Sequence, residues 1–322
     1  MNDLVITDSS LKDRLIPLRK KLDLAYGADE NDFLLTLPIG DDVSVGEYFY
    51  FEGTECGGIV DGREIDYTNG APVTAYNGRS WQGILAHSVI CPDAGSDYLA
   101  YSGDLHSILS MIVERQGLGG LFAVESGSSG FTASGKFDRY TDAYTAIRKI
   151  CKSVGAKLVI RKASGGHRVE LSVEACRVVN LDSDKYCLNI AEGRYTNHLV
   201  CLGSGELAQR VVVHLYTDGD GNVSQTRTFS GVDEIAEVYD YNNAEAGELT
   251  EKGTERLNEL FGDACELTLS DNLGLEIGDV VRAASVDKGI VIEATVEKVI
   301  VNVENGTETV SYEVGNLTKR GG

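Results

Sequence analysis

A glycine-rich segment is the part of the sequence whose spacing comes nearest to a cofactor-binding motif. Gly203-Ser-Gly205-Glu-Leu-Ala208 follows an apolar run and matches the dinucleotide fingerprint G-x-G-x-x-A. That fingerprint holds a pyrophosphate at the N-terminus of a helix within a βαβ unit. Here Val211-Val-Val213 begins a second apolar run only a few residues later, which leaves no room for the helix. We therefore interpret the segment as a tight connection between two strands and predict no cofactor.

An acidic segment further along the chain has part of the spacing of a calcium loop. Asp218, Asp220 and Asn222 occupy its first, third and fifth positions. An EF-hand loop also requires glycine at its sixth position and glutamate at its twelfth, where this chain has Val223 and Phe229. The favoured interpretation is a polar hairpin turn, and calcium binding near Asp218–Asn222 is left open.

The five histidines form no recognised catalytic or zinc motif; they are His87, His106, His167, His198 and His214. The sequence has no H-E-x-x-H, no G-x-S-x-G and no phosphate loop that ends in Gly-Lys-Ser/Thr. Asp138, Asp142 and His167 are too weakly placed to be nominated as a site. A site assembled from distant residues stays open, so we name no catalytic, cofactor-binding or metal-binding residue. On this basis the chain is predicted not to be an enzyme.

The charge of the chain is strongly acidic. Its 322 residues hold 29 lysines and arginines against 50 aspartates and glutamates, a formal net charge of -21. A surface that binds nucleic acid needs clustered lysine and arginine to displace counterions from the phosphates. Anionic membranes attract basic segments for the same reason. The composition argues against both kinds of binding, while 42% hydrophobic residues are enough for a folded core.

The cysteines and the N-terminal residues indicate where the chain is made. The seven cysteines are widely spaced without a C-x-x-C pair, so neither a zinc site nor a disulfide framework is expected. The first thirty residues contain no apolar run of signal-peptide length. No later stretch approaches the roughly 18 apolar residues of a membrane span. We expect synthesis in the cytoplasm and no membrane insertion.

The first hundred residues are predicted to form a β-meander. Apolar runs alternate with Asp61-Gly62, Asn69-Gly70 and Asn77-Gly78, and such dipeptides tolerate the positive φ of tight hairpin turns. Trp81, the only tryptophan, is predicted to anchor a core or an interface from a strand. The expected strands are 33–37, 47–51, 58–60, 64–68 and 73–76.

The middle of the chain carries two amphipathic helices. Asp104 is a candidate N-cap for a helix whose apolar residues recur at three- and four-residue spacing until Gly117. Thr141 is the candidate cap of a second helix, which ends at Gly155. We expect an exposed loop at 125–135 and a hairpin formed by 157–160 and 169–173. Residues 103–190 are therefore predicted to be α+β.

The C-terminal part returns to strands. Ile290, Ile292, Ala294 and Val296 alternate with more polar residues, the pattern of a sheet with one solvated face. A helix is predicted at 249–261, although Gly253 costs about 1 kcal/mol there relative to alanine. No linker rich in proline or serine is present, so domains must pack directly or share strands. The expected strands are 199–202, 210–216, 223–229, 267–269, 279–286, 290–303 and 308–314.

Taken in order, several segments match the pieces of one known family. The most specific are Leu202-Gly-Ser-Gly-Glu-Leu207 and Arg210-Val-Val-Val-His-Leu-Tyr216. The others are Leu22–Tyr26, Asn31–Leu35, Gly78–Leu85, the helix at Asp104, Tyr239–Asn242, the helix Glu248–Leu260, Glu276–Val281 and Tyr312–Gly315. In this order they resemble the tail hub and tail-tip proteins of siphophage-type tails, relatives of the baseplate hub of contractile phage tails. No single segment is diagnostic, and the order carries the resemblance.

The resemblance implies a mainly β fold in which two tail-tube-like β-barrel domains flank an α/β region. We place an N-terminal tube-like β domain at residues 1–102 and an α+β insertion domain at 103–190. The second tube-like β domain, with one helix near 249–261, is placed at 191–322. The implied function is structural: a homotrimeric ring joins the sixfold tail tube to the tip and lets DNA pass without specific binding.

The implied partners are the tail tube or distal tail protein, the tape measure protein, and tip or receptor-binding proteins. The implied location is a virion tail or tail-like particle, assembled after synthesis in the bacterial host cytoplasm. An acidic lumen would suit DNA passage, because lysine and arginine would hold the phosphates. An acidic surface that only keeps the protein in solution explains the charge equally well.

Two other functions stay open at this point. A cell-wall (peptidoglycan) hydrolase would need acids or a nucleophile that converge in a cleft. A carbohydrate-binding tip module would need exposed aromatic side chains clustered in one groove, and Trp81 has no second aromatic at a telling spacing.

Overall fold

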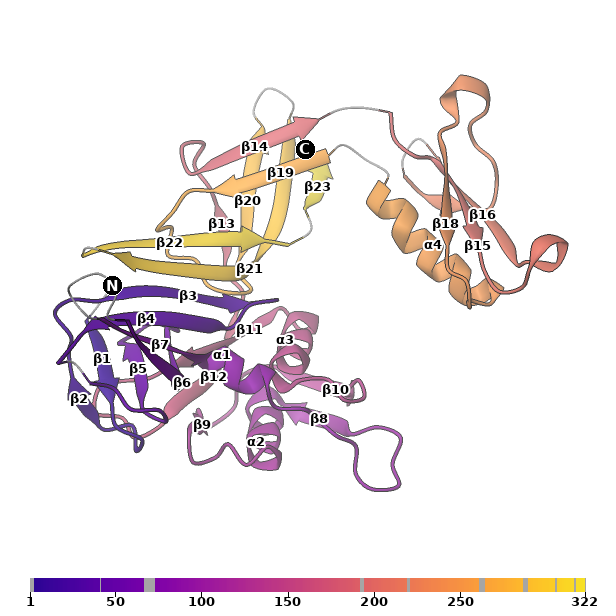
Figure 1. The fold of residues 1–322 in the computed structure, drawn as a ribbon. Helices are drawn as coiled ribbons and strands as arrows, with labels where there is room; N and C mark the ends of the chain where they lie inside the picture. Colours follow the sequence, from indigo (N-terminus) through magenta and orange to yellow (C-terminus); the bar gives the residue numbers. More distant parts are fainter. Residues whose placement is uncertain are drawn as a thin grey trace. The chain divides into compact units, whose positions relative to one another are not determined.

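The computed structural model describes residues 3–40, 42–66, 73–191, 194–218, 221–260, 264–285, 289–304, 306–315 and 317–321 (Figure 1). The chain divides into two compact units. The first unit combines Met1–Cys187 with Leu267–Gly322, and the second is Leu188–Glu266. The N-terminal and C-terminal parts of the sequence therefore belong to the same unit.

The first unit is built on a large antiparallel sheet, in which neighbouring strands follow the order β2-β1-β5-β6-β7-β4-β3-β21-β22. The strands are β1 (Leu4–Thr7), β2 (Asp13–Leu15), β3 (Lys21–Gly27), β4 (Asp32–Pro38), β5 (Tyr48–Phe51), β6 (Gly57–Asp66), β7 (Val73–Ser80), β21 (Ile290–Glu304) and β22 (Thr307–Val314). The expected strands at 33–37, 47–51, 290–303 and 308–314 are confirmed. Antiparallel pairing of β3 with β21 joins the two ends of the sequence in one sheet (Figure 1).

Strand β21 takes part in two sets of pairings. Its first half pairs with β20 (Val280–Ser285) and β23 (Thr318–Gly321), and its second half pairs with β3 and β22. The register against β22 shifts between Val296 and Lys298. Strand β13 (Val178–Asn180) adds to β20 in parallel. The long C-terminal strand thus connects the large sheet to the strands that follow the α+β segment.

Gly27 is required where β3 meets the irregular part of β21. Its φ is +145°, and a Cβ placed on it would lie 2.1 Å from the carbonyl oxygen of Glu297. The next residue donates a backbone hydrogen bond to that oxygen, from Ala28 N at 3.0 Å. Because only glycine allows both this φ and this close approach, the contact depends on the missing side chain.

Two of the three expected hairpin turns near the N-terminus are wrong. Asp61-Gly62 lies inside β6 at a register shift, and Asn77-Gly78 lies inside β7. The carboxylate of Asp61 accepts two hydrogen bonds at 2.8 Å from the Arg79 guanidinium on the neighbouring strand. A Cβ on Gly78 would lie 2.0 Å from the Ile59 carbonyl oxygen. These glycines therefore permit a β-bulge and the close approach of the β6 and β7 backbones. The third pair, Asn69-Gly70, lies outside the described residues.

Trp81 begins a helix, so its expected place on a strand is wrong. Helix α1 (Trp81–Ala86) is capped by Ser80, whose side chain accepts a hydrogen bond from Gly83 N at 3.1 Å. The indole is fully buried and stacks on Tyr48, with ring centroids 5.8 Å apart. Its predicted role as a core anchor is confirmed.

The α+β segment packs onto the same unit. Its elements are β8 (Ala100–Asp104), α2 (Leu105–Arg115), β9 (Phe122–Val124), β10 (Thr132–Lys136), α3 (Ala143–Ser153), β11 (Ala156–Arg161) and β12 (Val169–Ala175). Both expected helices and the hairpin are confirmed, and Asp104 caps α2 as predicted. The cap of α3 is Asp142 rather than Thr141, because the Asp142 carboxylate accepts the hydrogen bond from Thr145 N at 2.8 Å. The expected loop at 125–135 is only partly a loop, since β10 pairs with β8.

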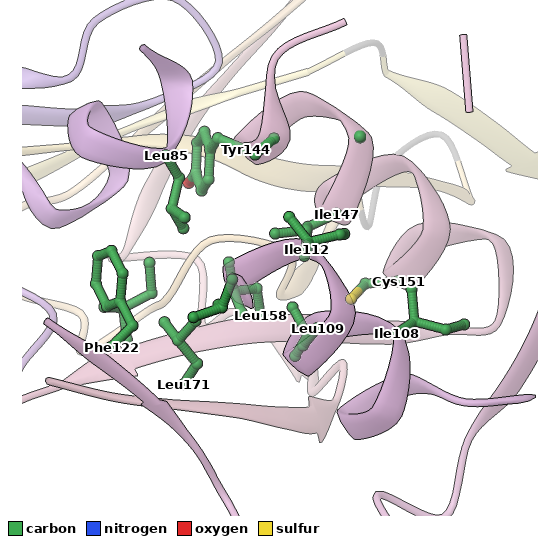
Figure 2. Close-up of a cluster of buried hydrophobic side chains, with 14 of the residues drawn as sticks. Leu85, Ile108, Leu109, Ile112, Phe122, Tyr144, Ile147, Cys151, Leu158 and Leu171 are labelled. Carbon is green, nitrogen blue, oxygen red and sulfur yellow. The ribbon is translucent and has the colours of Figure 1, made fainter. Parts of the chain in front are cut away.

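A buried apolar cluster holds the helices against the strands (Figure 2). Figure 2 labels ten of its members: Leu85, Ile108, Leu109, Ile112, Phe122, Tyr144, Ile147, Cys151, Leu158 and Leu171. The cluster also includes Tyr50 and Trp81 from the N-terminal segment. The α+β segment therefore shares its core with the strands that precede it in the sequence.

The second unit is a four-stranded sheet with one helix. The sheet has the order β17-β16-β15-β18, formed by β15 (His198–Leu202), β16 (Val212–Thr217), β17 (Val223–Ser224) and β18 (Ala236–Asp240). Helix α4 (Ala246–Leu260) packs on one face through Leu249 and Leu257. Gly253 allows this approach, since a Cβ there would lie 2.5 Å from Cys201 Sγ. The helix is confirmed; the expected strand 223–229 is much shorter, and β18 was not expected.

The predicted fold class is confirmed at its coarser level, a mainly β protein with a few helices. Strands β14 (Tyr186–Ala191) and β19 (Ala264–Leu269) pair with each other, and each contains one boundary between the two units. Among the pairings of the described residues no sheet closes into a barrel. The predicted domain boundaries at residues 102/103 and 190/191 stay a prediction. Pairing of a strand from the first segment with one from the last segment is observed.

Replacing Gly27 by alanine tests the contact between β3 and β21. The added Cβ meets the Glu297 carbonyl and the positive φ is strained, so we expect Gly27→Ala to lower the free energy of unfolding by roughly 2–4 kcal/mol. Urea denaturation measures the change. Gly119→Ala is the control, because a Cβ at Gly119 meets nothing within 4 Å. Equal stability of the two variants would contradict the assigned role.

Candidate functional site

The glycine-rich segment is a tight strand connection, as predicted. Strand β15 ends at Leu202, one 3-10 turn (Leu207–Gln209) follows, and β16 begins at Val212. A Cβ on Gly203 would lie 2.5 Å from the Ala244 carbonyl oxygen, and Gly205 has a φ of +93°. The glycines therefore serve backbone packing, and the segment lacks the helix that would hold a pyrophosphate.

The acidic segment forms a turn closed by its own side chains. The Asp218 carboxylate accepts hydrogen bonds from the backbone N and the side-chain Nδ2 of Asn222, both at 2.8 Å. Asp220 lies outside the described residues. No group of three or more His, Cys, Asp or Glu side chains able to hold a metal occurs in the described part of the chain. Calcium binding at this turn stays untested.

The structure brings two of the five histidines together. His198 Nε2 lies 2.8 Å from His214 Nδ1, and His198 Nδ1 lies 2.7 Å from Glu234 Oε1. The Tyr216 ring stacks on His198 at 4.3 Å. Burial lowers the pKa of His198, and the nearby Glu234 carboxylate only partly opposes this. No motif in the sequence marks this cluster, and the signal that indicates it is the pairing of β15 with β16 across the glycine-rich connection.

The acids considered for catalysis have structural roles. Asp138 pairs with Lys149 at 2.5 Å on the surface, and Asp142 caps α3. His167 is exposed. These contacts give neither acid a free position beside a nucleophile, and the structure does not favour a catalytic role for them.

Of the helices among the described residues, none is long and apolar enough to cross a membrane.

A group of charges around a buried ion pair in the first unit is the strongest candidate for a functional site, and we call it the charged junction. Its members are Lys157, Arg161, Arg177, Glu276 and Asp279. The ammonium of Lys157 lies 2.5 Å from Glu276 Oε2 and 2.7 Å from Asp279 Oδ1. Arg161 binds the other oxygen of Glu276 at 2.5 Å, and Arg177 binds Asp279. The cations come from the α+β segment and the acids from the C-terminal segment.

Strand geometry explains why these cations reach the acids. Lys157 and Arg161 lie on one face of β11, because alternate residues of a strand share a face, while Leu158 and Ile160 enter the apolar cluster. Gly278, with a φ of +90°, lets the loop before β20 approach β11, since a Cβ there would lie 2.9 Å from Lys157 Cβ.

The centre of the junction lies away from solvent, while Arg161 and Arg177 cover it from the partly exposed side. The side chain of Lys157 is 2% exposed and that of Asp279 is fully buried. Burial by itself would raise the pKa of Asp279, but hydrogen bonds from Arg177 and Lys157 outweigh it, and the pKa lies below its ordinary value. Burial would likewise lower the pKa of Lys157, yet its bonds to Asp279 and Glu276 raise it. All of these groups are therefore charged near neutral pH.

Glu55 adds a second buried acid next to the junction. Its Oε1 accepts a hydrogen bond from Ile160 N at 2.9 Å, and its Oε2 is buried without a hydrogen-bond partner in the described structure. Burial raises the pKa of Glu55 to about 8, and Glu276 raises it further against the opposing Arg161 and Lys157. The residue also lines a cavity of about 470 Å³, together with Tyr26, Cys56 and Tyr312. Glu55 therefore carries a proton at neutral pH.

The charged junction has a structural role. Together with the neighbouring Glu55, it ties the β5–β6 turn, strand β11 and the loop before β20 to one another. No nucleophile paired with a general base is part of it. What the arrangement can do is fix the relative positions of three stretches of the first unit that lie far apart in the sequence.

The comparison with solved structures finds tail proteins. The 43 kDa tail protein of prophage MuSo2 from Shewanella oneidensis matches 98% of this chain and 98% of that chain, with a TM-score of 0.50 and 12% identity. Two further matches have a TM-score of 0.49. Prophage tail protein gp18 from Listeria monocytogenes EGD-e is 12% identical and matches 97% of this chain and 94% of that chain. The tail protein from Neisseria meningitidis MC58 is 14% identical and matches 98% of this chain and 96% of that chain. No protein-family model and no curated protein sequence matches the chain. The likeness to the MuSo2 protein shows that the chain has the fold of a phage tail protein over nearly its whole length, which confirms the resemblance at the level of the fold.

Removing the central acid tests the charged junction. Asp279→Asn leaves the buried Lys157 with a single acid and removes the nearer of the two acidic partners of Arg177, so we expect a loss of about 3 kcal/mol in the free energy of unfolding. The matched control is Asp93→Asn, which breaks the surface pair with Arg115 and should cost less than about 0.5 kcal/mol. Urea denaturation compares them, and similar losses in both variants would contradict the account.

The raised pKa of Glu55 should make the stability of the fold depend on pH. Because its pKa rises from 4.5 in the unfolded chain to about 8 in the folded one, its stabilising contribution is complete below pH 4.5 and is lost as the pH rises to about 8. Glu55→Gln keeps the neutral form, so its stability relative to the wild type should grow by about 1.4 kcal/mol per pH unit across this window. Thermal or urea unfolding from pH 5 to 9 measures the difference. A difference that stays constant with pH would show that Glu55 is ionised in the folded protein.

Proposed function

We propose that this protein is a structural component of a phage tail or a prophage-derived tail-like particle, and that it acts as the hub at the tip. The observation that carries the proposal is the fold, which matches the MuSo2 tail protein over 98% of both chains. The order of the sequence segments from Leu22–Tyr26 to Tyr312–Gly315 supports the same assignment. In this role the chain has no catalytic activity of its own.

In the proposed assembly three copies form a ring that joins the sixfold tube to the threefold tip. The strand-rich segments 1–102 and 191–322 supply two tube-like β domains per copy around the bore, with 103–190 as the insertion. The pairing of β3 with β21 makes the two segments parts of one sheet, so in this arrangement the two β domains share strands. Large symmetric interfaces of the obligate kind, above about 2,000 Å², hold such rings together.

The net charge of -21 suits a channel for DNA. A lumen that carries acids repels the phosphates, so the strand passes without being held. The proposed neighbours are the tail tube or distal tail protein, the tape measure protein, and tip or receptor-binding proteins. The mature location is the virion tail or tail-like particle.

Localisation and copy number in isolated particles test the proposal. Antibodies against the chain, detected by immunogold electron microscopy, should label one end of the tail, and quantitative mass spectrometry should give half as many copies as one ring of the tube protein contains. A chain that is absent from purified particles, or that releases soluble fragments from peptidoglycan, would contradict it. An inert preparation that never enters particles would also count against the hub.

A further inference from the structure

A cavity of about 480 Å³ opens beside α3 in the first unit. Its walls come from α3, from the start of β11, from the loop before β20 and from β21, elements that Figure 1 draws close together. The inner surface is mostly apolar and is formed by Tyr144, Ala156, Leu158, Ile277 and Val280. The charged junction lies next to it, because Lys157 also lines the cavity. The space can therefore accept a large apolar side chain without disturbing the fold.

The rim of this cavity is basic in an otherwise acidic protein. Helix α3 carries Arg148, Lys149 and Lys152 and no acid, and all three bases line the cavity. Glu297 is the one acidic side chain among the lining residues, and it lies 3.6 Å from Lys152. With acids outnumbering bases 50 to 29 in the whole chain, three bases on one helix face are an unusual local concentration.

The rim charges are available to an outside partner. Lys149 pairs with Asp138 and Lys152 with Glu297, in exposed contacts that contribute little stability and exchange readily. Arg148 stacks over the Tyr144 ring at 5.5 Å and has no acidic partner in the described part of the chain. A ligand that fits both the apolar interior and this rim combines an apolar side chain with neighbouring carboxylates.

We propose that the occupant of this cavity is an acidic segment of a second copy of this chain. The inference rests on the proposed ring and names the surface through which neighbouring copies meet. A copy with a net charge of -21 is the partner that such a rim attracts. Suitable segments exist in the second unit: Val238 is 67% exposed beside Glu237, and Val232 is 83% exposed beside Asp233.

This contact is heterologous, because a cavity on one copy receives a different surface of the next. Heterologous contacts repeat around an axis and close into a ring when the rotation fits. Attraction at the rim also offsets the repulsion between highly acidic copies. It makes association sensitive to salt, because exposed charges are screened.

Charge reversal at the rim tests the inference. Arg148→Glu with Lys152→Glu changes the net charge by -4 and should weaken self-association at least about tenfold, as seen by sedimentation velocity at an ionic strength near 0.05 M. The matched control is Lys252→Glu with Arg256→Glu on α4, which makes the same charge change at the same spacing on the solvent-facing side of a helix. The control should associate like the wild type. If the first variant fails to fold, Lys149→Glu with Lys152→Glu replaces it, since both lysines are exposed.

Two further measurements separate this contact from others. Hydrogen exchange of the wild type should slow in α3 and at the start of β11 on association. The rim variant keeps its own acidic segment, so in mixtures it should bind to the cavity of wild-type copies. Because its own rim cannot accept a further copy, it should limit the size of the wild-type oligomers.

Equal association of the rim variant and the wild type, or a wild type that stays monomeric up to about 200 µM at low salt, would overturn the inference. A different tail protein that protects α3 in particles would overturn it as well. None of these results bears on whether the chain is found at the tail tip, which the particle experiment decides separately.

Discussion

The buried attraction between Lys157 and the acids Glu276 and Asp279 is the constraint on which the first unit depends. The lysine belongs to the α+β segment and the acids belong to the C-terminal segment, 122 residues away in the case of Asp279. A buried charge that loses its partner is costly, so these segments are held in one arrangement. Glu55 brings the N-terminal strands to the same place through its bond to Ile160. The pairing of β3 with β21 then continues the connection as a sheet.

Local signals in the sequence predicted the helices well. Asp104 and Gly117 mark α2, and Gly155 ends α3, because caps and positive-φ glycines act through neighbouring residues alone. The same reasoning failed at Asp61-Gly62 and Asn77-Gly78. Whether such a pair makes a turn or a bulge depends on the strand beside it, here on Arg79 and Ile59, and a sequence does not show which strand that is.

The candidate site was harder to predict than the fold. Lys157 stands inside the apolar strand β11, which is a signal of a buried cation, but its acids lie in a distant loop. The contact between His198 and His214 could be predicted only with the register of β15 against β16, which the sequence does not show. The family resemblance predicted a mainly β fold of the phage tail type, and the match to the MuSo2 tail protein along the whole chain confirms that level. The two barrel domains that it also implied stay a prediction.

The proposed function requires that copies of this chain, each with a net charge of -21, assemble around a bore. Electron cryomicroscopy of the tip of the isolated particle is the most direct measurement of this claim. For the proposed ring we expect threefold density around an open channel, into which three copies of the first unit fit with β3 beside β21. Density that holds a single copy, or copies arranged without a central opening, would contradict it.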